Sequence, residues 1–295
     1  MGRRDWALLL GLAVLWGGSF VFVEMALIGL PPLAVVWCRV AGGAVVLALM
    51  LWRAGVAWPR GWGAWRALAV MGGLNNALPF TLFALAQGRI GGGLAAILNA
   101  MTPMLTVVAL FVLAGERPGT GRVLGVIAGL AGVAVMMGRP GAGDLWAKLA
   151  CLGAAGCYAL ASVWGRRLWR MEIAPLAAAF GQCLSAAVLL LPVVLVLRVW
   201  EGAAPVPQVW AAVTGLAVLS TGLAYAIFFR LFATVGAVNV QLVTFLIPVV
   251  AVGLGVILLG ERLEPHHLAG AALIGLGLAV IDGRLWHMLR TRISS

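Results

Sequence analysis

Two short stretches of this sequence place a polar side chain one helical turn before an aromatic ring. Asn76 lies four residues before Phe80. Thr221 lies four residues before Tyr225. Residues four apart share one face of a helix, so each pair could orient a polar group and stack an apolar one. The alternative is hydrogen bonding between helices with ordinary packing; the recurrence in both halves of the chain favours a binding surface.

Two prolines stand near the middle of long apolar segments. Inside a helix, Pro103 would free the carbonyl of Asn99, because proline clashes with the carbonyl four residues earlier. Pro248 would likewise free the carbonyl of Thr244. Within a bilayer such a carbonyl must be satisfied by protein, water or ligand. The two alternatives are a kink satisfied locally and a broken-helix substrate site.

Further candidates come from aromatic residues at related positions. Trp16 and Tyr158 add one ring to each half of the chain, and Ser162 lies one turn beyond Tyr158. Phe83 matches Phe228 at the constant separation that relates the two halves. We expect Phe80, Tyr225 and Trp16 to contact the apolar part of a small molecule by stacking.

Two charged residues fall well inside apolar segments, Glu24 and Arg39. A turn between them, near Gly29 to Pro32, would bring them to a similar depth. Because an unpaired charge at that depth is costly, we expect the two to pair or to share a polar neighbour. A structural role is favoured over a gate or a proton relay.

The elements that carry these residues must be membrane spans. The chain has 295 residues, of which 63% are hydrophobic and 10% charged, and its mean hydropathy is +1.09. Soluble proteins are about 45–50% apolar and about 25% charged. The net charge of +11 comes from basic residues between apolar segments, which favours membrane topology over nucleic-acid binding.

The pattern predicts an all-α integral membrane protein with ten spans. The breaks between apolar segments place the spans at 6–28, 32–52, 65–86, 91–113, 121–138, 145–167, 175–197, 208–230, 237–259 and 266–283. The longest break, at 139–143, contains strong helix breakers and divides the chain into halves of five spans, 1–140 and 141–295.

The two halves are copies of one unit. Gly91, Pro103 and Gly115-Glu116-Arg117 recur 145 residues later as Gly236, Pro248 and Gly260-Glu261-Arg262. A match at constant separation indicates duplication. Because each unit has an odd number of spans, the second must insert upside down, which is an inverted repeat typical of transporters.

Basic residues and glycines predict orientation and packing. Most of the 20 basic residues fall on one side, which places both termini in the cytoplasm. Glycines of the fifth span, among them Gly125 and Gly132, match Gly270 and Gly277 of the tenth. We therefore expect these spans to pack within one chain, with homodimerisation as the alternative.

The chain resembles a known family at several of these points. Leu15-Trp16-Gly17, Pro32 followed by Arg39, and the two Gly-Glu-Arg turns are similar to the EamA branch of the drug/metabolite transporter superfamily. Within that branch the overall similarity is to bacterial aromatic amino-acid exporters of the YddG type. Gln182 stands where the second half would repeat Arg39, so Arg39 has no symmetric partner.

The resemblance implies a monomer in the bacterial inner membrane that exports small molecules from the cytoplasm. It implies a central cavity lined by spans 1, 3, 4, 6, 8 and 9. Carried onto this chain, the cavity residues are Trp16, Asn76, Phe80, Phe83, Asn99, Tyr158, Ser162, Thr221, Tyr225 and Thr244. Pro103, Pro248, Glu24 and Arg39 are expected in structural or gating roles.

The mechanism we expect is alternating access to a site near the bilayer midplane. Neutral polar groups would suit a neutral zwitterion such as an amino acid, because a strongly charged solute requires a buried counter-charge. Glu24, if paired, would carry protons poorly, which favours uncoupled or weakly coupled transport.

Two other functions stay open: export of other small metabolites or drugs, and an intramembrane enzyme. The sequence has no nucleotide-binding loop, metal-ligand set or intramembrane catalytic constellation. The sequence therefore predicts that the protein has no cofactor. The partners that it predicts are membrane lipid and a small-molecule substrate.

Overall fold

The computed structural model describes residues 2–137, 144–203, 205–240 and 242–282, and all regular structure within them is helical. The first half contains α1 (Arg3–Leu27), α2 (Pro32–Arg53), α3 (Trp62–Gly72), η1 (Gly73–Ala77), α4 (Leu78–Gln87), α5 (Gly92–Asn99), α6 (Thr102–Ala114) and α7 (Thr120–Met137). The second contains α8 (Leu145–Arg170), α9 (Pro175–Val196), α10 (Pro207–Ala217), η2 (Val218–Leu223), α11 (Ala224–Val240), α12 (Val243–Leu259) and α13 (Pro265–Asp282).

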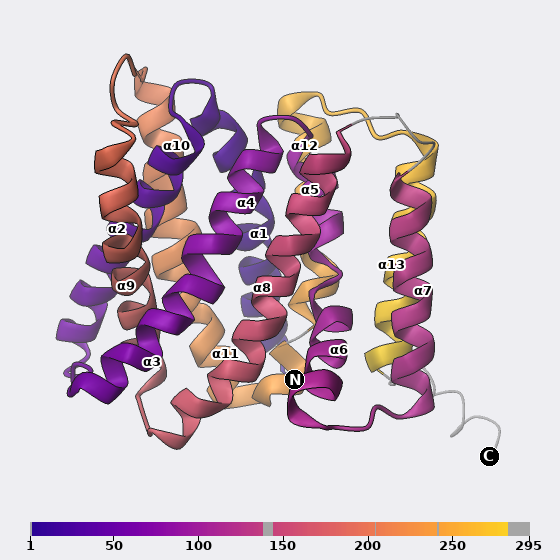
Figure 1. Ribbon diagram of the computed structural model, residues 1–295, viewed down its shortest axis with the longest axis horizontal. Helices are drawn as coiled ribbons and strands as arrows, with labels where there is room; N and C mark the ends of the chain where they lie inside the picture. Colours follow the sequence, from indigo (N-terminus) through magenta and orange to yellow (C-terminus); the bar gives the residue numbers. More distant parts are fainter. Residues whose placement is uncertain (1, 138–143, 204, 241, 283–295) are drawn as a thin grey trace.

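The helices run up and down along one common direction, with short loops at both ends of the bundle (Figure 1). Eight helices of the described part of the chain are long and apolar enough to cross a membrane. They coincide, within a few residues, with the first eight predicted spans. The ninth and tenth predicted spans correspond to shorter apolar helices at Val243–Leu259 and Pro265–Ile281.

Several helix ends follow directly from the local sequence. Proline occupies the first turn of α2, α9 and α10, where its missing N–H costs no hydrogen bond. At the other end, α6 stops at Gly115 and α12 at Gly260, both in the left-handed conformation that glycine adopts without strain. In each case the following glutamate lies just past the helix, so Glu116 and Glu261 are placed alike at opposite ends of the bundle.

Two π-helical turns interrupt spans three and eight at equivalent positions. The first, η1, holds Asn75 and Asn76, and the second, η2, holds Ser220 and Thr221. A π-turn adds a residue to one helical turn and often occurs at functional sites. The polar residues that precede the aromatic rings therefore do not have ordinary α-helical register. The sequence did not predict these π-turns.

Helices α7 and α13 pack side by side at one edge of the bundle (Figure 1). A Cβ on Gly125 would lie 2.6 Å from the carbonyl oxygen of Gly277, and one on Gly132 would lie 2.7 Å from that of Gly270. Such distances leave no room for a side chain, so the glycines bring the two backbones into contact. The predicted packing of the fifth and tenth spans within one chain is confirmed.

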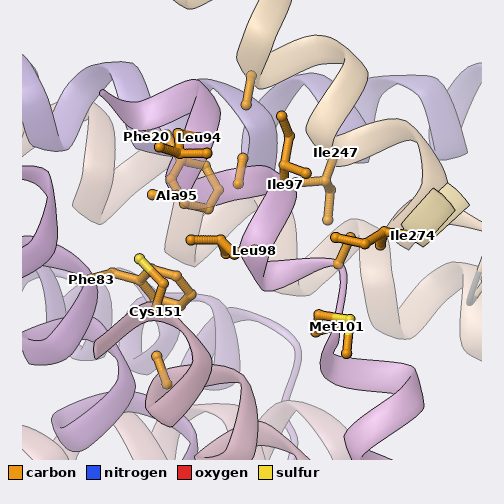
Figure 2. Close-up of a cluster of buried hydrophobic side chains, with 14 of the residues drawn as sticks. Phe20, Phe83, Leu94, Ala95, Ile97, Leu98, Met101, Cys151, Ile247 and Ile274 are labelled. Carbon is orange, nitrogen blue, oxygen red and sulfur yellow. The ribbon is translucent and has the colours of Figure 1, made fainter. Parts of the chain in front are cut away.

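The largest apolar cluster surrounds α5 at the centre of the molecule. Figure 2 shows side chains from α5 and from the turn after it meeting side chains from α1, α4, α8, α12 and α13, among them Phe20, Phe83, Leu94, Ala95, Ile97, Leu98, Met101, Cys151, Ile247 and Ile274. All of α5 except its last residue, Asn99, is buried. This short helix is thereby held rigidly beside the cavity described next.

Candidate substrate cavity

A cavity of about 1130 Å³ lies within the bundle and is lined by both halves of the chain. Its volume is of the size that holds a small organic molecule. Twelve of the fourteen residues singled out from the sequence line it, namely Trp16, Phe80, Phe83, Asn99, Tyr158, Ser162, Thr221, Tyr225, Thr244, Pro103, Pro248 and Arg39. The two that do not are Asn76 and Glu24.

Asn75 takes the place predicted for Asn76. The Asn76 side chain is fully buried, and its Nδ2 lies 3.8 Å from Sγ of Cys183 on α9. Asn75 lines the cavity, where its Nδ2 donates to Oε1 of Gln182 at 3.0 Å and to the Tyr225 hydroxyl at 3.4 Å. The reason is the π-turn, in which residues five apart, such as Asn75 and Phe80, take the relation that residues four apart have in an α-helix.

An aromatic wall covers one side of the cavity. The rings of Phe83 and Tyr158 are nearly parallel with centroids 6.3 Å apart, and Phe20 meets Phe83 edge to face at 5.7 Å. Trp16 lies 5.5 Å from Phe228 of α11. Aromatic faces of this kind favour planar or apolar groups of a bound molecule.

The cavity is not neutral, because Arg39 of α2 lines it. The guanidinium carbon lies 3.8 Å from the centre of the Phe80 ring, and Nε donates to the Thr221 hydroxyl at 3.4 Å. The residue is only 8% exposed. The sequence pointed to Arg39 as a structural or gating charge, so its position among the cavity residues is a finding of the tertiary structure.

The predicted free carbonyl of Asn99 is satisfied locally. The Thr102 hydroxyl donates to it at 2.8 Å. The structure thus combines features of both alternatives, a carbonyl satisfied locally and a broken span: α5 ends at Asn99 and α6 begins at Thr102, with Pro103 in its first turn. In the second half, Gly236 (φ 77°, ψ 165°) interrupts α11, and α12 begins at Val243 with Pro248 inside it.

The cavity reaches the loops at one end of the bundle. Glu116, Arg122, Arg166 and Glu172 line this mouth. Arg166 donates a hydrogen bond to Glu116, which holds the pKa of the Glu116 carboxyl below its usual value and keeps it ionised at neutral pH. The mouth is therefore lined by charges of both signs.

The other end is closed around the start of α5. Both oxygens of the Glu261 carboxylate accept from the main-chain N–H of Gly93, at 3.0 and 3.3 Å, and Glu24 accepts from that of Gly92 at 3.1 Å. A Cβ on Gly91 or Gly255 would lie 2.8 or 2.7 Å from the Glu261 carboxyl group, so a larger residue at either position would displace this carboxylate. Of the described cavity residues, none belongs to the loops 28–31, 88–91 or 260–264.

The predicted pairing of Glu24 with Arg39 is wrong. Glu24 binds α5 and lies beside Glu261, whereas Arg39 contacts Thr221 and Phe80. Among the described residues no ion pair joins Glu24 to Arg39. The depth of the two charges was a poor guide because their side chains leave α1 and α2 towards different neighbours. Because Glu24 does not pair with Arg39, the expectation of uncoupled or weakly coupled transport has no support in the structure.

More spans line the cavity than the resemblance implied. Besides spans 1, 3, 4, 6, 8 and 9, α2 contributes Arg39, α9 contributes Gln182, and α13 contributes Leu278 and Ile281. Sequence reasoning missed Asn75, Gln182 and the closing role of Glu261. The one available signal was the repeated Gly-Glu-Arg turn, which marked Glu261 without indicating its contact.

Comparison with known proteins agrees with this architecture. A solved crystal structure superposes with a TM-score of 0.68 over the full length of both chains at 21% identity, which establishes the similarity of fold. The probable amino-acid metabolite efflux pump of Salmonella typhimurium is 27% identical over 95% of each chain. The uncharacterized transporter YvbV of Bacillus subtilis is 28% identical over 95% of this chain and 92% of its own. Protein PecM of Dickeya dadantii is 26% identical over 76% of this chain and 75% of its own.

A multi-pass helical membrane protein with a central cavity is the class that these features define. The model of the EamA-like transporter family matches residues 6–138 and again 144–282. The chain belongs to the EamA-like transporter family.

Proposed function

We propose that this protein exports small metabolites, most of all amino acids including aromatic ones, by alternating access. The observation that carries the proposal is a cavity with polar and aromatic walls whose lining, among the described residues, reaches the loops at one end of the bundle. Its size and mixed lining suit an amphiphilic molecule of amino-acid dimensions. The similarity to a probable amino-acid metabolite efflux pump supports the same substrate class.

The arrangement that we infer is two inverted repeats of five spans, 1–140 and 141–295. Gly125 and Gly132 of α7 correspond in the repeat to Gly270 and Gly277 of α13. Gly125 packs on Gly277 while Gly132 packs on Gly270. Reciprocal contacts of this kind are expected when a two-fold axis relates two copies, and the equivalent positions of η1 and η2 support the same symmetry.

Alternating access follows from the different contacts of two equivalent glutamates. Glu261 binds the start of α5 at the closed end, whereas its repeat mate Glu116 pairs with Arg166 at the open mouth. By the repeat, Glu116 would bind the main-chain N–H of residue 238 when the cavity opens to the opposite side. The two ends would then close in turn around a fixed site.

The orientation that we propose places both termini in the cytoplasm, in the bacterial inner membrane, with the protein acting as a monomer. The basic residues concentrate at the end that carries the cavity mouth, as expected for a cytoplasmic surface. The structure then corresponds to an inward-open state that is ready to take up a cytoplasmic solute.

Exchange in liposomes that contain only this protein tests the proposal. Vesicles loaded with unlabelled Phe, Trp, Met or Thr should take up the labelled amino acid. The variants Phe83→Ala and Tyr158→Phe, which alter the aromatic wall, should lower the rate. Val188→Ala, on the exposed surface of α9, serves as the matched control and should exchange normally.

The outcomes separate the candidate functions. Absence of exchange with every amino acid, from folded protein, contradicts the amino-acid proposal, and competition by other amphiphiles would point to a metabolite or drug exporter. Chemical conversion of the bound compound would point to an enzyme. Normal exchange in both aromatic variants would keep the function and place the site elsewhere.

A further inference from the structure

Arg39 is a buried cation without an acidic partner among the described residues. It contacts the Phe80 ring and the Thr221 hydroxyl. The titratable groups that act on it are Tyr158, Tyr225 and Cys183, none of which is a carboxylate. A guanidinium carries five N–H donors, so most of its hydrogen-bonding capacity is unused by the protein.

The surroundings hold this cation in place. Phe80 covers one face of the guanidinium, and Thr221 fixes Nε. Thr221 itself donates to the carbonyl of Leu216 at 2.9 Å, and a Cβ on Gly43 would lie 2.5 Å from its methyl group. Since the Thr221 side chain is thus held between α10 and α2, Arg39 has a preorganised position on the cavity wall.

We propose that Arg39 binds the carboxylate of the transported solute. The inference rests on the proposed transport function and specifies its substrate class as small molecules that carry a carboxylate. Burying an uncompensated cation is costly, and an anion that enters the cavity offsets that cost. A planar guanidinium also matches a carboxylate with two parallel hydrogen bonds.

The same geometry orients the rest of the solute. With its carboxylate on Arg39, an amino acid would extend its amine and side chain into the cavity. The amide oxygen of Asn75 and the hydroxyls of Tyr158 and Tyr225 can accept hydrogen bonds from an ammonium group. The aromatic wall at Phe83 receives the side chain. The cavity should therefore reject amines that lack a carboxylate.

Competition against wild-type exchange of labelled phenylalanine tests this inference without any mutation. Unlabelled phenylalanine and 3-phenylpropionate, which both keep the carboxylate, should inhibit. Phenylalanine amide and phenethylamine should inhibit at least tenfold more weakly. Equal inhibition by all four compounds overturns the role of Arg39 and leaves the transport function intact. Absence of any amino-acid exchange overturns both proposals.

Variants add a second readout. Arg39→Gln should weaken inhibition by the carboxylates at least tenfold and leave inhibition by the amide unchanged, whereas Arg39→Lys should retain part of the preference. Val45→Ala, on the exposed side of α2, is the control. If Arg39→Gln weakens inhibition by all four compounds to the same extent, Arg39 has a structural role and does not bind the carboxylate. If Arg39→Gln does not fold, the wild-type competition decides.

Discussion

Asn75 and Asn76 are neighbours in the chain with different environments. Asn75 faces the cavity and bonds to Gln182 and Tyr225, whereas Asn76 is enclosed against Cys183. One residue of register therefore separates a side chain that lines the cavity from one that is fully buried, and the π-turn determines which residue takes which position. This distinction leads to opposite expectations for two adjacent substitutions.

Asn75→Ala should lower the exchange rate and leave the folded protein nearly as stable. One hydrogen bond from Asn75 to the bound solute is worth about 0.5–1.5 kcal/mol, so its loss corresponds to a rate loss of roughly twofold to tenfold. Asn76→Ala should instead lower the unfolding temperature in detergent, because it empties buried space, with exchange per folded molecule close to wild type. Slow exchange in Asn76→Ala together with normal exchange in Asn75→Ala would indicate that Asn76 binds the solute.

At the scale of elements, glycine contacts fix α7 against α13. Gly132→Ala would force a Cβ to 2.7 Å from the Gly270 carbonyl oxygen, so overpacking of about 1–3 kcal/mol should lower the unfolding temperature. Gly121→Ala in the same helix is the matched control, since its Cβ would meet only the Val280 carbonyl oxygen, at 3.8 Å. Equal unfolding temperatures would show that the close approach contributes little.

The closing contacts at the two ends of the bundle should have opposite effects on conformation. Glu261→Gln removes the charge that binds the start of α5, which should favour the outward-open state by about 1–2 kcal/mol, or roughly fivefold to thirtyfold in population. Glu116→Gln should favour the inward-open state, because the charged Glu116 is proposed to close the other end.

A cysteine inside the cavity measures both effects. Ser19 lines the cavity and accepts a conservative Ser19→Cys change, made in a chain without the four native cysteines. An impermeant maleimide added from outside should label it faster in Glu261→Gln and more slowly in Glu116→Gln. A change in the same direction in both variants would contradict the exchange of roles between the two glutamates.

At the scale of the whole molecule, the proposed inverted topology would place equivalent loops on opposite sides of the membrane. Gly119 and Glu264 occupy the same position in the two repeats. Gly119→Cys should react only with reagent on the cytoplasmic side, and Glu264→Cys only with reagent outside. Labelling of intact cells before and after permeabilisation shows on which side of the membrane each cysteine is accessible. Labelling of both positions from one side would exclude the inverted arrangement.

Several properties of this protein follow from its sequence alone. Apolar segments of about 20 residues are typical of membrane helices, so the positions of the spans can be predicted without knowledge of tertiary contacts. The repeated Gly-Glu-Arg turns, with glycine ending α6 and α12 in the left-handed conformation, encode the duplication locally. The glycines of α7 and α13 predicted their packing, because small residues permit close approach whatever the rest of the fold does.

Tertiary structure alone decided which polar groups meet. Glu24 and Arg39 share a depth in the sequence but bind different partners, since direction around a helix is set by packing. The register at Asn75 and Asn76 depends on a π-turn that no local pattern marked. Arg39 became a cavity cation only once α2, η2 and α4 converged, because the surroundings of a charge are made by distant segments of the chain.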